Sequence, residues 1–355
     1  MDSDIQQARV LFYCLGGGMG HLTRAAAISR KLKRFVKGTI AILTNSPFHY
    51  LLEIEDVHFI YLRNLVEIDD HAGNLIRGLI GEVDPELLVV DSYPAGIRGE
   101  LVPLLEGGAF RKILLRRYIP HDLIDPVKFC EYTRSYYDLV IDCEALPPLD
   151  HPMELVACPL LIRDADELFS RETARDILLA KGDEKVVLGV ATGKKEEAQR
   201  FMKLVEKAFM QIHNDAYVLR FASPYNFTDF HEIWHNIKYF PLFELFRGVD
   251  VLVGYAGYNL HYESRALSIP TIFIGHQGER EGFQPGSIYS QAEATVEDIE
   301  KKLREKMASG GGTAESPAEF ECATSKAAAY LTNLLFSGEN FEVKEYKDRI
   351  DWFLM

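Results

Sequence analysis

Residues 9–34 read RVLFYCLGGGMGHLTRAAAISRKLKR, and their pattern is the strongest indication of the fold. It opens with an apolar run, continues through a cluster of glycines and ends with apolar residues at helical spacing. The pattern predicts a strand, a glycine-rich turn and a helix. Glycines let the backbone approach a ligand closely, and the start of a helix offers free N–H groups and a positive dipole end to an anion such as phosphate.

The turn does not match the dinucleotide-binding fingerprint. After Gly16 and Gly18 that fingerprint requires glycine or alanine at position 21, where this chain has a histidine. A dehydrogenase therefore fits poorly. The positive end of a helix dipole favours a neutral imidazole, which is the form that a general base needs. His21 is thus the candidate base, and the alternative interpretation is a tight turn with a buried histidine.

Length and composition narrow the class of protein. The 355 residues are enough for two domains, and 47% of them are hydrophobic. We find no apolar run of roughly 18 residues and an acidic, polar N-terminus, so we expect no membrane span, no signal peptide and a cytoplasmic location. The five cysteines include no C-x-x-C pair, which favours reduced thiols. A net charge of -14 argues against nucleic acid as the main ligand and disfavours peripheral contact with a membrane.

Apolar strands alternate with helical patterns along the whole chain, which indicates parallel sheets covered on both faces. A proline-rich stretch, 146–159, separates two such series and is expected to be a linker, with the domain boundary near residues 150–165. We therefore predict an α/β protein with two doubly wound, Rossmann-like domains that face a cleft. We expect residues 1–155 in the first domain, 156–335 in the second, and 336–355 in a C-terminal helix that packs back on the first.

The second series contains another strand, turn and helix that favours a ligand, in the sequence VDVLVGYAGYNLHYESRALSIPTIFIG. Gly257 lies in the turn, and Glu263 follows it by six residues, where its carboxylate could accept two vicinal hydroxyls. The alternative is a glutamate on a helix face paired with Arg265 or a lysine. The loop after the next strand, 275–285, is rich in polar residues, and loops at strand ends often carry function. In the first half, Arg116 at the end of a strand is a candidate for an acceptor or phosphate contact, or else a solvated strand end.

A competing motif is His231-Glu232-Ile233-Trp234-His235, which matches the H-E-x-x-H signature of zinc hydrolases. It lies between Pro224 and Pro241 and has no third ligand at the usual spacing downstream. We interpret it as a short helix that packs Trp234, and we expect no metal site.

The sequences GGGMGHLTRA and DVLVGYAGYNLHYESRALSIPTIFI resemble those of two-domain GT-B nucleotide-sugar glycosyltransferases, closest to the bacterial lipid II N-acetylglucosaminyltransferase group. The resemblance covers both domains in outline and is specific in these two motifs. It implies that His21 faces the acceptor and the reacting carbon, with the glycine turn beside it. The implied donor-binding residues are Gly17, Gly18, Gly20, Thr192, Gly193, Gly257, Tyr258, Asn259, Glu263, Gln277 and Gln284. Arg24, Lys194 and Arg116 are candidates for acceptor or phosphate contacts.

One departure from the family lies after the first strand of the second domain, where a G-G-S turn is common and this chain has Ala191, Thr192, Gly193 and Lys194. A lipid acceptor also fits poorly with the acidic charge. The resemblance implies inverting, metal-independent transfer from a nucleoside diphosphate sugar, with a uridine diphosphate sugar expected, no further cofactor, and an acceptor that stays open. A nucleotide-sugar hydrolase or epimerase of the same fold is the first alternative, and a non-catalytic sugar-nucleotide binding protein is a remote one.

Overall fold

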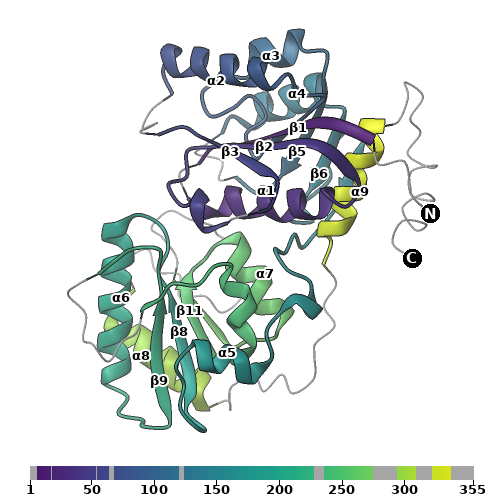
Figure 1. Ribbon diagram of the computed structural model, residues 1–355. Helices are drawn as coiled ribbons and strands as arrows, with labels where there is room; N and C mark the ends of the chain where they lie inside the picture. Colours follow the sequence, from purple (N-terminus) through teal and green to yellow (C-terminus); the bar gives the residue numbers. More distant parts are fainter. Residues whose placement is uncertain are drawn as a thin grey trace, which may run out of the picture. The chain divides into compact units, whose positions relative to one another are not determined.

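The computed structural model describes residues 6–16, 18–52, 54–63, 68–119, 124–227, 236–274, 294–308 and 322–336. They form two compact units, which are described one at a time (Figure 1). The first comprises Met1–Ile162 and Cys322–Met355, and the second comprises Arg163–Glu321. The chain thus leaves the first unit after Ile162, within the expected range of 150–165, although we drew the boundary after residue 155. It returns at Cys322, whereas we expected the second domain to extend to residue 335.

The first unit is built on a parallel sheet of seven strands in the order β3-β2-β1-β4-β5-β6-β7. Burial on both faces explains why the central strands are apolar throughout, as in LLVVD of β4. The strands are β1 (Gln6–Cys14), β2 (Val36–Thr44), β3 (Val57–Tyr61), β4 (Leu87–Asp91), β5 (Arg111–Arg116), β6 (Leu139–Asp142) and β7 (Glu154–Val156). The last of these lies inside the proline-rich stretch that we expected to be a linker, so that expectation is wrong for 154–156.

Helices cover both faces of this sheet (Figure 1). One side carries α2 (Asp70–Val83), α3 (Val102–Gly107) and α4 (Pro126–Tyr136), which share a buried cluster with alternate residues of the strands. On the other side α1 (Met19–Leu32) packs against α9 (Thr324–Phe336). A short 3₁₀ turn, η1 (His49–Leu51), follows β2. Asp side chains cap α2 and α4, because Asp69 accepts from the Ala72 amide and Asp125 accepts from the amides of Val127 and Lys128.

Helix α9 explains why the first unit includes residues far along the chain. It buries an alanine-rich face that allows close approach to α1. The Thr324 hydroxyl donates to the carbonyl of Leu161 at 2.8 Å, and the Ala323 amide donates to the carbonyl of Pro159 at 2.9 Å. A returning helix therefore exists at 324–336, whereas residues 337–355, where we expected it, lie outside the described part of the chain.

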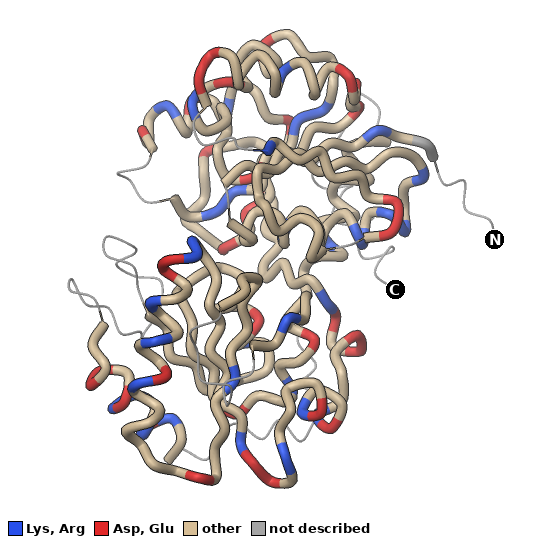
Figure 2. The backbone as a smooth tube through the Cα atoms, turned by 60° about the vertical axis from the view of Figure 1, so that its left-hand side comes forward, with Lys and Arg blue, Asp and Glu red and all other residues tan. Residues whose placement is uncertain are grey.

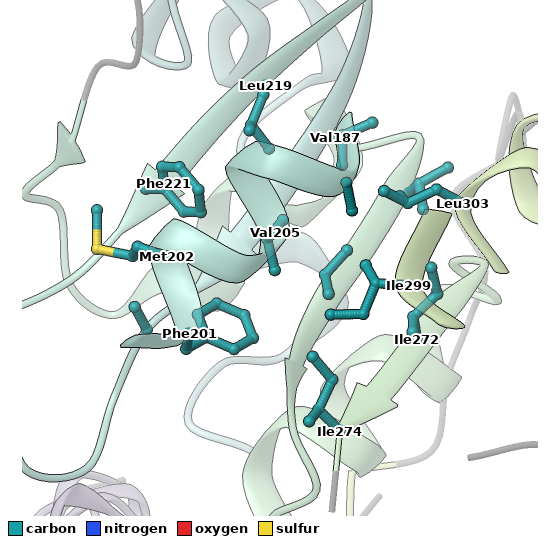
Figure 3. Packing of buried hydrophobic residues seen from close by; sticks show 14 of the residues in the cluster. Val187, Phe201, Met202, Val205, Leu219, Phe221, Ile272, Ile274, Ile299 and Leu303 are labelled. Atoms are coloured by element: carbon teal, nitrogen blue, oxygen red, sulfur yellow. The ribbon is translucent and has the colours of Figure 1, made fainter. Parts of the chain in front are cut away.

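The second unit is a parallel sheet of five strands in the order β10-β9-β8-β11-β12. Helices α6 and α8 cover one face and bury Phe201, Val205, Ile299 and Leu303 against it (Figure 3). Helix α7 and the packed pair α5 and η3 lie on the other face (Figure 1). The elements are η2 (Ala165–Glu167), α5 (Arg171–Ile177), β8 (Lys185–Val190), α6 (Lys195–Met210), β9 (Tyr217–Ala222), β10 (Asn236–Ile237), η3 (Leu242–Gly248), β11 (Val251–Tyr255), α7 (Tyr258–Ala266), β12 (Thr271–Ile274) and α8 (Val296–Ala308).

Charged residues lie mainly on the helices and loops of both units, and the two signs are interspersed (Figure 2). The central strands carry few charges because they are buried on both faces. The charged side chains that are nevertheless buried at the carboxyl ends of strands are the exceptions, and they include Asp91 and Asp142.

Candidate functional site

The strand order of the first unit creates a topological switch point between β1 and β4. These two strands are neighbours, while the chain continues from β1 to β2 on one side and from β4 to β5 on the other. In open parallel sheets the loops at the carboxyl ends of two such strands diverge and leave room for a ligand. The glycine turn follows β1 and Asp91 is the last residue of β4, so both lie at this switch point.

Backbone contacts shape the glycine turn. The Gly16 amide donates to the side-chain Oδ1 of Asn45 at 2.9 Å, and the Gly18 amide donates to the carbonyl of Gly16 at 2.8 Å. A Cβ atom on Gly16 would lie 2.4 Å from Cδ2 of His21, so only glycine leaves space for the imidazole. Among the described residues, a Cβ atom on Gly18 would meet nothing within 4 Å, and no side chain caps α1 there. The first turn of α1 therefore keeps amides and open space beside His21.

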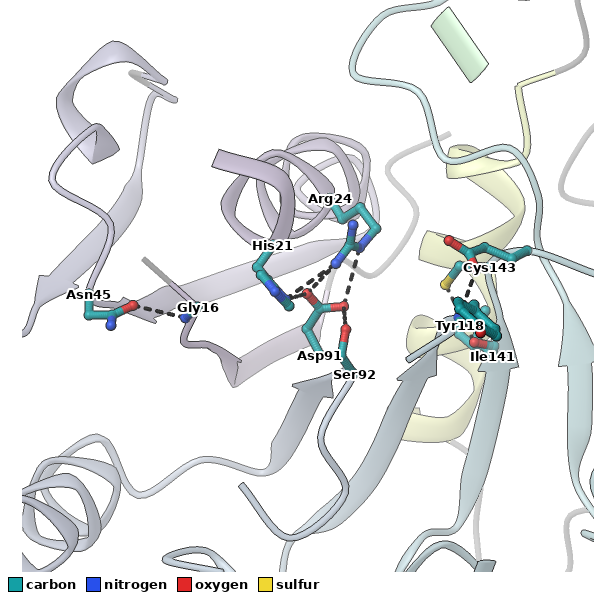
Figure 4. A network of polar contacts seen from close by, with 10 residues as sticks. Gly16, His21, Arg24, Asn45, Asp91, Ser92, Tyr118, Ile141 and Cys143 are labelled. Atoms are coloured by element: carbon teal, nitrogen blue, oxygen red, sulfur yellow. Dashed lines mark hydrogen bonds and ion pairs between the residues drawn. The ribbon is translucent and has the colours of Figure 1, made fainter. Parts of the chain in front are cut away.

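The imidazole of His21 is bound to a buried carboxylate (Figure 4). Its Nδ1 atom lies 2.6 Å from Oδ2 of Asp91, and the two side chains are 15% and 1% exposed. Arg24, one helical turn further along α1, is fully buried and donates from Nη2 to the same Oδ2 at 2.7 Å and from Nε to Oδ1 at 3.2 Å. The three side chains form one charged, hydrogen-bonded cluster.

The charge of Asp91 determines which nitrogen of His21 carries the proton. Burial by itself would raise the pKa of the Asp91 carboxyl, but Arg24 and His21 outweigh that effect and hold the pKa well below its ordinary value. An ionised carboxylate only accepts hydrogen bonds, so Nδ1 of His21 donates and Nε2 keeps its lone pair. Burial lowers the pKa of His21 despite the opposing effect of Asp91, so the imidazole is neutral at pH 7. This is the form that accepts a proton.

The loop after β4 shapes the surroundings of the cluster. Ser92 has a left-handed backbone, with φ of 75°, which turns the chain directly after Asp91. The ring of Tyr93 stacks near His21 with centroids 6.5 Å apart. Burial raises the pKa of the Tyr93 phenol, so it stays protonated, and the nearby Arg117 charge acts in the direction that lowers the pKa of His21.

Sequence reasoning missed Asp91, although a signal existed. We read ELLVVD, 86–91, only as a buried strand, yet an aspartate that ends a fully apolar central strand lies where ligands bind in doubly wound sheets. Arg24 was expected to contact an acceptor or a phosphate. The structure corrects this expectation, because its guanidinium is 0% exposed and directed at Asp91.

Arg116 also has a different place from the one we expected. It is buried at the end of β5, where its guanidinium pairs with Glu154 and with Asp142 and donates to the carbonyl of Pro147. These contacts bind together the last three strands of the first sheet. The structure therefore assigns Arg116 to the fold rather than to a ligand.

In the second unit, Gly257 and Glu263 lie on one strand–turn–helix, as expected. Gly257 is the first residue before α7, and among the described residues a Cβ atom there would meet only the Tyr255 carbonyl, at 3.9 Å. Glu263 is 8% exposed and, within the described residues, its carboxyl makes neither a hydrogen bond nor an ion pair. Burial raises the pKa of Glu263 to about 8, so the group is mostly neutral at pH 7. The alternative in which Glu263 pairs with Arg265 is wrong.

The residues beside Gly257 differ in accessibility. Tyr258 is 3% exposed and its ring contacts that of Tyr262 with centroids 4.8 Å apart, so it belongs to the packing of α7. Asn259 is half-buried. A buried carboxyl without a partner is costly in a folded protein, which makes Glu263 the stronger indication of a ligand in this unit.

The turn between β8 and α6 brings Thr192, Gly193 and Lys194 together. Gly193 has a left-handed backbone, with φ of 95°, and its carbonyl accepts from the Tyr225 hydroxyl at 2.6 Å. The Lys194 amide donates to Oε2 of Glu197 at 3.3 Å. A carboxylate thus already lies at the start of α6, where an anion would bind. This turn is therefore a weaker candidate for a phosphate site than we expected.

Three sets of predicted residues lie outside the described part of the chain. They are Gly17, the glutamines Gln277 and Gln284, and the H-E-x-x-H motif at 231–235. Among the residues that the structure describes, no three His, Cys, Asp or Glu side chains are gathered so that they could hold a metal ion. In the same residues no helix is long and apolar enough to cross a membrane.

No protein-family model matches this chain, and no curated protein sequence matches it. Solved structures do match it over almost its whole length. The chain has the GT-B fold. A proposed UDP-N-acetylglucosamine 2-epimerase from Listeria monocytogenes aligns with a TM-score of 0.61 and 12% identity, over 96% of this chain and 99% of that one.

Two further matches are a second epimerase and a glycosyltransferase. The UDP-GlcNAc 2-epimerase from Neisseria meningitidis, bound to UDP-GlcNAc, aligns with a TM-score of 0.60 and 10% identity, over 94% of this chain and 100% of that one. The spinosyn forosaminyltransferase SpnP aligns with a TM-score of 0.55 and 12% identity, over 98% and 99% of the two chains. At such low identity the likeness concerns the fold, and function has to be argued from the site.

Proposed function

We propose that this protein transfers a sugar from a nucleoside diphosphate donor to an acceptor hydroxyl, with inversion at the anomeric carbon and without a metal. The observation that carries the proposal is the hydrogen bond between Nδ1 of His21 and the ionised Asp91. It leaves a neutral imidazole, at the switch point of the first sheet, whose Nε2 makes no hydrogen bond to the described residues. A neutral imidazole that is oriented by a carboxylate is suited to remove a proton from a hydroxyl.

The first unit supplies the base. The acceptor hydroxyl donates its proton to Nε2 of His21 while its oxygen forms a bond to the anomeric carbon. The bond between that carbon and the diphosphate oxygen breaks, and its electron pair leaves with the diphosphate. Asp91 stabilises the imidazolium that forms, because it is ionised and lies 2.6 Å from Nδ1. The proton then passes from Nε2 to solvent.

The second unit supplies the groups for the donor. In this proposal the Glu263 carboxyl accepts hydrogen bonds from the two vicinal hydroxyls of the ribose. The backbone at Gly257, which has no side chain, lies against the diphosphate. Glu263 is buried and has no partner among the described residues, which supports this assignment, because a ligand with two donors would satisfy the carboxyl. The sequence resemblance favours a uridine diphosphate sugar. Two of the matched structures contain UDP or UDP-GlcNAc, and one contains thymidine diphosphate.

A second candidate function uses the same donor without an acceptor. Epimerases of nucleotide sugars stand beside glycosyltransferases among the matches of similar TM-score, which favours neither class. His21 serves a hydrolase or an epimerase as well as a transferase, because each of them removes a proton. The classes differ in their products. A hydrolase releases free sugar, an epimerase forms an isomerised donor, and a transferase forms a glycosylated acceptor.

For the acceptor we propose a water-soluble compound in the cytoplasm. The motifs resemble those of the lipid II N-acetylglucosaminyltransferase group, whose acceptor is a lipid, but a net charge of -14 disfavours approach to an anionic membrane surface. We propose no cofactor beyond the donor.

The test begins with donor identity. Thermal unfolding of the full chain should be followed with uridine, guanosine, cytidine and thymidine diphosphate sugars, because a ligand that binds only the native state raises the melting temperature. We expect uridine diphosphate sugars to raise it and Glu263→Ala to remove the effect. Incubation of the stabilising donor with and without pooled acceptor alcohols then separates transfer from hydrolysis and epimerisation. Binding of none of the four donors would refute the proposal.

A further inference from the structure

Arg24 is an unusual residue for its position. It lies on α1 between Thr23 and Ala25 and is fully buried, and apart from Lys31 the other buried side chains of this helix are small or aliphatic. Removing a guanidinium from water is costly unless a counter-charge and hydrogen bonds replace the lost solvation. Asp91 supplies both, and the same carboxylate holds His21. A buried cation at this place therefore acts on the histidine through Asp91.

The geometry constrains the carboxylate at two points. Nε of Arg24 donates to Oδ1 at 3.2 Å and Nη2 donates to Oδ2 at 2.7 Å, a two-point grip that prevents rotation of the carboxylate. Oδ2 is then directed at Nδ1 of His21. Nη2 also lies 3.3 Å from Nδ1. Both nitrogens bear hydrogen, so this is a contact between two hydrogen-bond donors. The guanidinium charge at this distance opposes protonation of the imidazole.

An isolated pair of carboxylate and imidazole behaves differently. The negative charge alone favours the imidazolium, which cannot act as a base. A guanidinium beside the carboxylate offsets that charge and keeps the carboxylate ionised, because arginine does not lose its proton in proteins. The two effects together favour a neutral imidazole whose proton is on Nδ1.

We propose that Arg24 is a positioning residue that holds Asp91 ionised and oriented, so that His21 keeps its proton on Nδ1 and presents an unprotonated Nε2 at neutral pH. This inference rests on the proposed function for its catalytic meaning and names the residue that makes His21 a base. Arg24 itself does not touch the substrate in this assignment.

Other ionisable groups act on the same cluster and enter the test. Burial raises the pKa of Tyr93, of Cys14 and of Cys143, so these three groups are neutral at pH 7. Asp142 and Glu144 act on Cys143. Arg117 carries the one further positive charge that acts on His21 in the described residues, in the same direction as Arg24. An Arg117→Gln variant measures its share.

The experiment is a titration of ¹⁵N-histidine-labelled protein by two-bond ¹⁵N–¹H correlation spectra, with His21→Gln to assign the signals. In the wild type we expect the protonated ring nitrogen to be Nδ1 and the midpoint to lie below 6.5. Arg24→Gln should raise the midpoint by on the order of one pH unit. Arg24→Lys keeps the charge and should raise it less. Arg34→Gln removes the same charge from an exposed position near the end of α1 and should leave the midpoint unchanged.

Two results would overturn the proposal. The first is a wild-type His21 with its proton on Nε2, or with a midpoint at or above 6.5, which needs no variant and is informative even if Arg24→Gln fails to fold. The second is an Arg24→Gln midpoint equal to that of Arg34→Gln. These measurements use no substrate, so an unsuccessful search for sugar transfer leaves them valid, while a wrong tautomer in an active enzyme refutes the role of Arg24 alone.

Discussion

Oδ2 of Asp91 lies 2.6 Å from Nδ1 of His21, although the two residues are 70 positions apart in the chain. The contact exists because β1 and β4 are neighbours in the first sheet, which brings the end of β4 beside the turn after β1. It joins the start of a helix to a buried carboxylate. The expected behaviour of His21, and of the residues around it, follows from this pair.

Replacement of His21 by alanine should remove the base and leave the nucleotide site intact. Loss of a general base lowers turnover by ~10²–10⁴-fold. We expect kcat to fall by this factor while the Kd for the donor nucleotide, measured by calorimetry, changes little. Unaltered kcat in this variant would eliminate His21 as the base.

Asp91→Asn should impair catalysis more than binding. The amide can donate to Nδ1, which moves the imidazole proton to Nε2 and blocks the atom that accepts a proton; in the comparable triad of serine proteases the same change costs roughly 10⁴-fold in kcat. We expect kcat to fall by about 10²–10⁴-fold. Steady-state kinetics at saturating donor would show this loss, and equal effects on kcat and on donor Kd would argue against it.

Asp91→Ala should also destabilise the first unit, because it leaves the buried Arg24 without its counter-charge. Breaking a buried pair by removing one partner costs roughly 3–5 kcal/mol of the free energy of unfolding. Urea unfolding followed by circular dichroism measures the change. The double variant Asp91→Leu with Arg24→Met, which removes both charges, should recover part of the loss.

The pH dependence of turnover should follow the lowered pKa of His21. Activity requires the neutral imidazole, so kcat/KM should be constant at neutral pH and fall as the pH decreases through the pKa of the folded protein, which lies below 6.5. The same shift affects stability: the neutral form is favoured on folding, so its contribution is present above 6.5 and is lost as the pH falls. An inflection of kcat/KM above pH 6.5 would contradict this assignment.

The contribution of Glu263 to stability should depend on pH in the opposite direction. Burial raises its pKa to about 8 in the folded protein, above that of an exposed glutamate. A raised pKa means that the folded protein binds the proton more tightly, so stability is present at low pH and is lost as the pH rises toward 8. Glu263→Gln should therefore raise the melting temperature at pH 8 and have little effect at pH 4.5. Equal shifts at both pH values would be evidence against a buried, protonated Glu263.

Donor binding should remove that proton. If the ionised carboxyl accepts the ribose hydroxyls, nucleotide affinity of the wild type rises with pH up to about 8, by at most roughly tenfold per pH unit. Glu263→Gln should bind more weakly and without this dependence. Calorimetry in two buffers of different ionisation enthalpy would detect the released proton, and a pH-independent affinity of the wild type would count against contact between Glu263 and the ligand.

Two glycines of the first turn make a matched pair. A Cβ atom on Gly16 would lie 2.4 Å from the His21 ring, whereas one on Gly18 meets nothing within 4 Å. Gly16→Ala should displace the imidazole and lower kcat without abolishing folding, and Gly18→Ala should leave the melting temperature unchanged. If a ligand approaches the Gly18 amide, Gly18→Ala weakens its binding all the same. Equal losses of kcat in both variants would contradict the difference in space.

Local patterns in the sequence were sufficient to predict the fold class and the position of His21 at the start of a helix. Buried parallel strands are apolar along their whole length. The cluster of glycines between β1 and α1 is typical of a tight turn in which the backbone approaches another group closely. Gly257 and Glu263 could be predicted for the same reason, since both lie on one strand–turn–helix. The strand β7 inside a proline-rich stretch could not, because three residues are too few to show a pattern.

The sequence by itself determined the alternation of strands and helices, the histidine at the start of the first helix and the glutamate on α7, because each depends on neighbours a few residues away. The tertiary structure was needed to show that Glu263 is buried with no partner among the described residues, that Asp91 and Arg24 hold that histidine, and that α9 returns to the first unit. These contacts join residues on different strands and helices. They follow from the order of the strands and from the packing of helices on the sheets, which bring distant segments together and exclude water from the charges between them.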